Sequence, residues 1–103
     1  MVLKDLARVV RHHIRSTDAF GRWGGEEFTI LLTNTHGEEA KKICGKLRKL
    51  IAKTPVGKQN LHITVSMGIT EVQTNDTLST VLKRADEALY KSKNRGKNRV
   101  TLL

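Results

Sequence analysis

The sequence predicts an α+β protein, an α/β sandwich in which helices cover one mostly antiparallel sheet. Three observations predict it: three segments with apolar residues at helical spacing, one segment of strict apolar–polar alternation, and a glycine pair between two short apolar runs. With 103 residues and 38% hydrophobic content, the chain can bury one modest core. We therefore expect a single domain over residues 1–103.

The first half of the chain predicts a helix followed by a hairpin. Residues 2–15 predict an amphipathic helix from the spacing of Leu3, Leu6, Val10 and Ile14. The helix begins without a capping residue, as if cut from a longer chain. Residues 19–23 and 28–33 predict the two strands that flank the glycine pair.

The second half predicts two helices and two strands. Thr35 to Glu38 has the form of a capping box, so we expect a helix from there to about Lys53. Residues 61–70 alternate strictly, which predicts a strand with one face in the core. A third helical stripe, which begins at Leu78, should stop near Gly96, and residues 99–103 predict a last short strand.

Composition narrows the class of partner. Nineteen Lys and Arg against ten Asp and Glu give a net charge of +9, which favours anions such as nucleotides, nucleic acid or acidic lipid. The four aromatic residues are too few for base stacking, so we expect no nucleic-acid partner. No long apolar run or signal peptide is present, which predicts a cytoplasmic protein.

Cysteine and histidine offer no clear metal or nucleophile chemistry. Cys44 lies on the apolar stripe of a predicted helix, where a small buried hydrophobe is expected. The four histidines show no zinc-type pairing with Cys44 or with each other, so we expect surface positions for His12, His13, His36 and His62.

The segment from Arg22 to Phe28 is the most informative part of the chain. Gly24 and Gly25 allow a sharp reversal and leave room for a ligand, while Glu26 and Glu27 follow directly. Adjacent carboxylates on a rigid turn suit a hard cation such as Mg²⁺. The alternative is an ordinary turn with solvated acids. Either way, we expect Trp23 and Phe28 to pack beneath the turn.

With that turn, the chain resembles the GGDEF family, the diguanylate cyclases that condense two GTP into cyclic di-GMP. Three more motifs stand in the family's order: Arg15 to Asp18 resembles its RxxD motif, Thr64 to Ile69 its TvSiGia strand, and Ala85 to Asn98 its ADxALYxAKxxGRN helix. The resemblance implies a palm-like, ferredoxin-like antiparallel sheet covered by helices.

The resemblance also implies roles for single residues. Glu26 would be a metal ligand for Mg²⁺ or Mn²⁺, and Glu27 the neighbouring catalytic carboxylate or a second metal contact. Gly24 and Gly25 would lie against the nucleotide. Lys93 and Lys97 match the family's phosphate-binding pair, although the second is Lys where the family has Arg. Their four-residue spacing predicts one shared helical face.

Arg15 and Asp18 would form an inhibitory site for the product, where an Arg can clamp phosphate or guanine and an Asp can accept from guanine. Binding there would be feedback inhibition. The alternative is a local surface ion pair of little energetic value. Lys46 or Arg48 could complete such a site.

The chain departs from the family at its front. Family members begin with a strand that bears a metal-binding Asp and a helix that reads guanine, and neither matches this sequence. The resemblance is thus to a domain truncated at its N-terminus, and we expect residues 1–103 alone to be inactive. Because the lost strand would be central, the chain could pair with a second copy through exposed sheet edges.

The partners implied are GTP, cyclic di-GMP, a second copy in a homodimer, and an upstream sensory or receiver domain. A second hypothesis is a non-catalytic cyclic di-GMP binding module that keeps Arg15 and Asp18. A nucleic-acid binder ranks third because it rests on charge alone.

Overall fold

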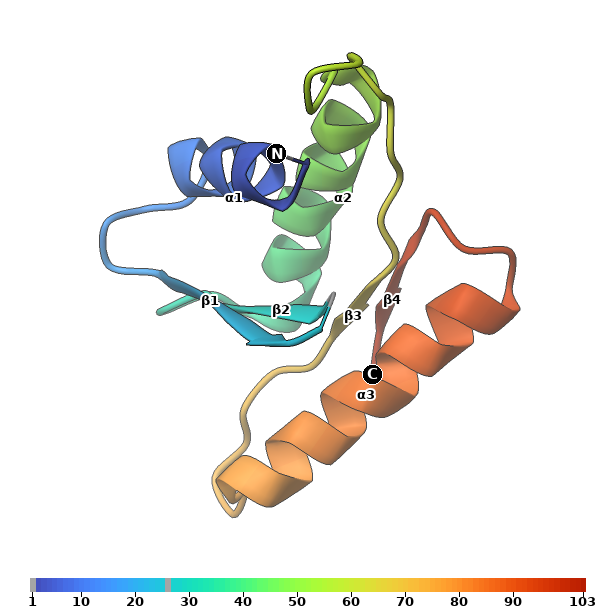
Figure 1. Ribbon diagram of the computed structural model, residues 1–103. Helices are drawn as coiled ribbons and strands as arrows, with labels where there is room; N and C mark the ends of the chain where they lie inside the picture. Colours follow the sequence, from blue (N-terminus) through green and yellow to red (C-terminus); the bar gives the residue numbers. More distant parts are fainter. Residues whose placement is uncertain (1, 26) are drawn as a thin grey trace.

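The computed structural model describes residues 2–25 and 27–103 as three helices and four strands (Figure 1). The α+β class is therefore confirmed, and each predicted segment contains the expected element. In chain order the elements are α1 Val2–His12, β1 Ala19–Gly24, β2 Glu27–Leu31, α2 Gly37–Lys53, β3 Met67–Ile69, α3 Leu78–Asn94 and β4 Val100–Leu102.

The strands form two separate pairs in the described part of the chain. β1 and β2 make an antiparallel hairpin in which Phe20 lies opposite Ile30 and Arg22 opposite Phe28. β3 and β4 are parallel, with Gly68 opposite Thr101. The expected single, mostly antiparallel sheet is therefore wrong for these residues, because β3 pairs with β4 and not with the hairpin.

The strand expected over residues 61–70 is confined to Met67–Ile69. The alternation correctly reported burial, since Ile63, Val65 and Met67 all pack against the core. Alternation records which side chains are inside, whereas a ladder also needs a neighbouring strand. Within the described residues, the parallel partner β4 spans only Val100–Leu102, so the ladder is equally short.

The main core lies between α1, α2 and the inner face of the hairpin. Its buried centre is formed by Leu6 and Val10 of α1 and Leu47 and Ile51 of α2. Phe20 and Phe28 pack against this centre and stack on each other, with ring centroids 5.2 Å apart. The apolar faces predicted for α1, α2 and the hairpin thus pack against one another in this core.

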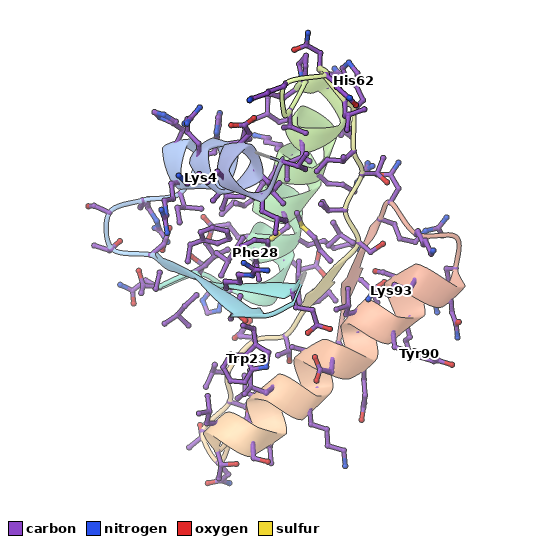
Figure 2. The ribbon with its side chains drawn as sticks, viewed as in Figure 1. Lys4, Trp23, Phe28, His62, Tyr90 and Lys93 are labelled. Carbon is purple, nitrogen blue, oxygen red and sulfur yellow. The ribbon has the colours of Figure 1, made fainter. Side chains whose placement is uncertain are left out.

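Trp23 does not join that core, contrary to expectation. Its side chain is 61% exposed, and Figure 2 shows it on the side of the hairpin opposite Phe28. Side chains alternate along a strand, and Phe20 and Arg22 share the inner face with their cross-strand partners. Trp23, one residue beyond Arg22, therefore points outward at an irregularity in the β1–β2 register.

The N-terminus of α2 is capped by a residue that is distant in the sequence. The N-cap residue is His36, which makes no side-chain cap bond, so the capping box expected from Thr35 is wrong. The hydroxyl of Thr35 donates instead to the carbonyl of Thr33. Glu71 supplies the cap: its Oε1 accepts from the Gly37 N–H at 2.6 Å, a bond that lowers the pKa of Glu71.

Helix α3 ends as the sequence predicts. Gly96 adopts φ +116°, and the N–H of Lys97 donates to the carbonyl of Ser92 at 3.0 Å. With the weaker bond from the Gly96 N–H to the Lys93 carbonyl, at 3.4 Å, this is a Schellman motif. The chain then turns back to form β4.

Helix α3 lies directly against β3 at Gly68. A Cβ built on Gly68 would lie 2.2 Å from the backbone N of Leu89 and 2.5 Å from the carbonyl oxygen of Ala85. Beside this contact the fully buried Ser92 donates to the Met67 carbonyl at 2.8 Å, and its hydroxyl lies 2.7 Å from that of Thr101. Glycine is therefore required for this approach.

Two other predictions are confirmed. Cys44 is buried in α2, and burial raises the pKa of its thiol to about 11. The four histidines are exposed. Among the residues that the structure describes, no helix combines the length and apolar content needed to span a membrane.

Candidate functional site

The glycine turn sits at the free end of the β1–β2 hairpin. Gly25 adopts φ +54°, and its carbonyl accepts a hydrogen bond from Nε of Arg22 at 2.8 Å. A Cβ built on Gly24 or Gly25 would have nothing within 4 Å, so the turn is open to a ligand. Glu27 opens β2 and is exposed, whereas Glu26 lies outside the described residues.

The described residues do not complete a metal centre. Residues 2–25 and 27–103 contain no group of three or more His, Cys, Asp or Glu side chains that could hold an ion. Glu27 alone provides one carboxylate, whereas Mg²⁺ requires an octahedral set of oxygen ligands. The metal assignment of Glu26 and Glu27 therefore stays a prediction.

Hydrogen bonds hold the carboxylate of Asp18, the acid of the candidate product site. Its Oδ1 lies 3.2 Å from Nη2 of Arg15 and accepts from the Thr33 N–H at 3.0 Å, while its Oδ2 accepts from the Arg15 N–H at 2.9 Å. The side chain is 2% exposed. These bonds lower the pKa of Asp18 to about 2, and the Arg15 side chain makes the largest contribution to this shift.

Arg15 is more open than its partner. Its side chain is 53% exposed, and Nη2 also donates to the Thr33 carbonyl at 2.5 Å and to the Thr35 hydroxyl at 2.8 Å. The pair thus fastens the segment after α1 to the segment after β2. The local ion pair considered from the sequence is present, and part of the guanidinium remains accessible.

A shallow hollow of about 390 Å³ lies beside this pair. Arg11 contributes a second guanidinium, whose Cζ lies 5.6 Å from the ring centroid of Phe20. Sequence reasoning missed Arg11 and Phe20, although the four-residue step from Arg11 to Arg15 is visible in the sequence. The hollow is lined by Arg11, Ile14, Arg15, Ser16, Asp18 and Phe20.

The two basic residues suggested as completing this site do not line the hollow. Arg48 donates from Nη1 to Oδ1 of Asn98 at 2.8 Å, so it contacts the loop after α3. Lys46 is exposed on α2. The structure therefore groups Arg15 with Asp18 and Arg11, and groups Arg48 with the C-terminal loop.

Lys93 and Lys97 do not share a helical face, so that expectation is wrong. Lys93 lies in the last turn of α3 (Figure 2). Helix α3 ends at Asn94, and Lys97 has φ +62° beyond the Gly96 turn. The Schellman motif stops the helical spacing before Lys97, and both side chains are exposed.

Charge is segregated along the chain. Residues 40–70 contain seven Lys or Arg and no acid, and residues 88–103 contain five and no acid. The bond from Arg48 to Asn98 joins these two segments in space. The remaining segments contain the other seven basic residues and all ten acids.

Comparison with known proteins identifies the family. Residues 1–99 match the family model described as "Diguanylate cyclase, GGDEF domain". The chain belongs to the GGDEF family. Diguanylate cyclase A of Treponema denticola is 34% identical over 106 residues, which cover 99% of this chain and 28% of that protein. Diguanylate cyclase DgcP of Pseudomonas aeruginosa is 40% identical over 101 residues, which cover 96% of this chain and 15% of that protein.

Solved GGDEF domains share the fold. The active GGEEF domain of a diguanylate cyclase from Vibrio cholerae matches with a TM-score of 0.87 and 37% identity, covering 97% of this chain and 65% of that one. The GGDEF domain of DgcB from Caulobacter crescentus, solved with cyclic di-GMP, matches with a TM-score of 0.86 and 29% identity, covering 94% and 60%. This chain thus spans less than a third of the two curated relatives and about two thirds of these solved chains.

Proposed function

We propose that this GGDEF domain serves a diguanylate cyclase, which condenses two GTP into cyclic di-GMP and releases pyrophosphate. The observation that supports this most is the unaltered turn from Gly24 to Phe28, set at the open end of a hairpin within a family match over residues 1–99. The Vibrio cholerae domain described as active has the same Gly-Gly-Glu-Glu-Phe letters. We keep the expectation that residues 1–103 alone form no product.

In this proposal the turn binds the reacting end of GTP. Gly24 and Gly25 leave space for the nucleotide, since no described atom beyond the adjoining residues lies within 4 Å of a Cβ at either position. The carboxylates of Glu26 and Glu27 help to hold Mg²⁺ or Mn²⁺, which when bound offsets charge on the triphosphate. Lys93 and Lys97 act as point charges toward phosphate.

The reaction needs a second copy of the domain. Each turn holds one GTP, so two domains in a homodimer bring two GTP together. We also propose control by an upstream sensory or receiver domain. A relative 33% identical to this chain is named Response regulator PleD, of Caulobacter vibrioides. The diguanylate cyclase SiaD of Pseudomonas aeruginosa was solved with its activator SiaC.

We propose that Arg15 and Asp18 bind the product and mediate feedback inhibition. Because the pKa of Asp18 is about 2, its carboxylate is ionised at neutral pH and holds the Arg15 guanidinium beside the hollow through their ion pair. The exposed part of Arg15 and the guanidinium of Arg11 can meet phosphate, and Phe20 offers a ring face in the same hollow.

A non-catalytic cyclic di-GMP binding module is the second candidate. It is favoured by the hollow beside Arg15 and Asp18, which does not involve the glycine turn.

Two titrations with two variants test both sites. Isothermal titration with cyclic di-GMP should show micromolar binding that is lost in Arg15→Ala and kept in Glu27→Gln. Titration with GTP and Mg²⁺ should show binding that is lost in Glu27→Gln and kept in Arg15→Ala. Cyclic di-GMP binding without any Glu27-dependent GTP binding would favour the non-catalytic module. A folded chain that binds neither nucleotide would refute both candidates.

A further inference from the structure

The loop after α3 has an unusual backbone. Gly96, Lys97 and Asn98 have consecutive positive φ angles of +116°, +62° and +48°. Glycine adopts such angles freely and asparagine tolerates them, whereas they are strained for lysine. A strained backbone persists only where surrounding contacts hold it, and such positions gather at functional sites.

Besides the bond from the Gly96 N–H to the Lys93 carbonyl, hydrogen bonds at Lys97 and Asn98 hold this loop. The N–H of Lys97 donates to the Ser92 carbonyl at 3.0 Å, and the Lys97 carbonyl accepts from Nε of Arg99 at 3.2 Å. The N–H of Asn98 donates to the hydroxyl of Ser66 at 3.1 Å, and its Oδ1 accepts from Nη1 of Arg48 at 2.8 Å. The backbone of Lys97 is thus bonded on both sides, while its side chain is exposed.

Two of these partners come from distant parts of the chain: Ser66 lies 32 residues before Asn98, and Arg48 of α2 lies 50 residues before it. Ser92 and Arg99 adjoin the loop in sequence, so their bonds close a local turn. The bond from Arg48 ties that turn to a helix of the core, whose Leu47 and Ile51 are buried. Together with the bond from the Asn98 N–H to Ser66, it fixes where the loop lies relative to the rest of the domain.

We propose that Arg48 is a positioning residue that acts through Asn98 to hold Lys97 where its ammonium meets a nucleotide phosphate. This rests on the proposed function, which gives Lys97 that role. Asparagine suits position 98 on two grounds, since it tolerates φ +48° and its amide oxygen accepts from Arg48. Lys97, placed by a turn and not by helical spacing, depends on this bond for its location.

A matched set of variants distinguishes the effect of the Arg48–Asn98 bond on loop position from the effect of the Arg48 charge. Arg48→Gln removes the guanidinium and one positive charge. Lys49→Gln removes one positive charge from the next, exposed residue of α2 and serves as the control. Asn98→Gly removes the acceptor without changing charge and keeps φ accessible. Arg48→Lys restores the charge and a single donor, so it should rescue part of the effect.

The first measurement needs no ligand. Amide hydrogen exchange at Lys97 and Asn98 reports the bonds to Ser92 and Ser66. We expect faster exchange at both amides in Arg48→Gln and Asn98→Gly, and no change in Lys49→Gln. Unchanged exchange in Arg48→Gln would overturn the positioning role outright.

The second measurement is titration of the chain with GTP and Mg²⁺. A single exposed hydrogen bond supports a weakening of about 3- to 10-fold in Arg48→Gln and Asn98→Gly. The double variant should be no weaker than either single one, because both remove the same interaction. Additive losses, or an equal loss in Lys49→Gln, would overturn the proposal. Wild-type chain that binds no GTP while exchange still responds would count against the proposed GTP site, whereas GTP binding that is unchanged in Arg48→Gln and Asn98→Gly would overturn only the positioning role.

Discussion

Replacing Gly68 with alanine should destabilise the domain severely. The new Cβ would lie 2.2 Å from the Leu89 nitrogen, 2.5 Å from the Ala85 oxygen and 2.8 Å from the Ala88 carbon. All three atoms belong to the α3 backbone, which no change of rotamer can move. Ordinary contact begins at 3.4 Å, so α3 and β3 must separate by more than 1 Å.

That separation also strains the bonds beside it. Ser92 is fully buried and bonds Met67 and Thr101 across the same interface. Overpacking of a core costs about 1–3 kcal/mol, and a buried polar group deprived of its partner costs about 1–3 kcal/mol more. We therefore expect Gly68→Ala to lower the free energy of unfolding by about 2–6 kcal/mol.

The assay is thermal unfolding followed by circular dichroism. A loss of 1 kcal/mol lowers the Tm of a domain of this size by about 4–8 °C, so a fall of at least about 8 °C is expected. Gly45→Ala is the matched control, since its Cβ meets nothing within 4 Å and it lies inside α2. That variant should gain about 0.5–1 kcal/mol from helix propensity. A Tm for Gly68→Ala within a few degrees of wild type would refute the close packing of α3 on β3.

Three further predictions concern single polar groups. Ser92→Ala should lower the free energy of unfolding in urea by about 1–3 kcal/mol, because it leaves the buried Thr101 hydroxyl without that partner; no loss would contradict the buried bond. Asp18 has a pKa of about 2 in the folded chain against about 4 when unfolded, so its stabilisation is complete above pH ~4 and disappears as pH falls toward ~2. Asp18→Asn should therefore flatten the stability curve across that window, and parallel curves would argue against the Asp18 bonds. Cys44 should resist a thiol reagent at pH ~8 until the chain unfolds, because burial keeps its thiol protonated; fast labelling of the native chain would contradict its burial.

The helices and the hairpin could be predicted because their signals are local. The apolar stripes of α1, α2 and α3 report one buried face each, and Gly96 ends α3 where a left-handed residue is needed. The cap of α2 could not be predicted from Thr35, because the group that bonds the Gly37 N–H is Glu71, 34 residues away. The outward position of Trp23 follows from strand alternation counted from the core residue Phe20, which the expectation that Trp23 packs beneath the turn did not apply.

The candidate site likewise has a part that could be predicted from the sequence and a part that could not. Arg15 and Asp18 are three residues apart, and their contact follows from that spacing. The placement of Lys97 required knowledge of the turn at Gly96 and of the bond between Arg48 and Asn98, which are distant in the chain. The lining of the hollow by Arg11 and Phe20 likewise depends on how α1 packs on the hairpin.

The segregation of basic residues gives the chain an asymmetric charge distribution. The two acid-free segments have a net charge of +12, while the rest of the chain has −3. An approaching polyanion is turned and accelerated by such a field before it touches the surface, which raises association rates. Ions screen the field within about 8 Å at physiological ionic strength. The encounter rate with a nucleotide should therefore fall with added salt, even where the bonds made after docking stay the same.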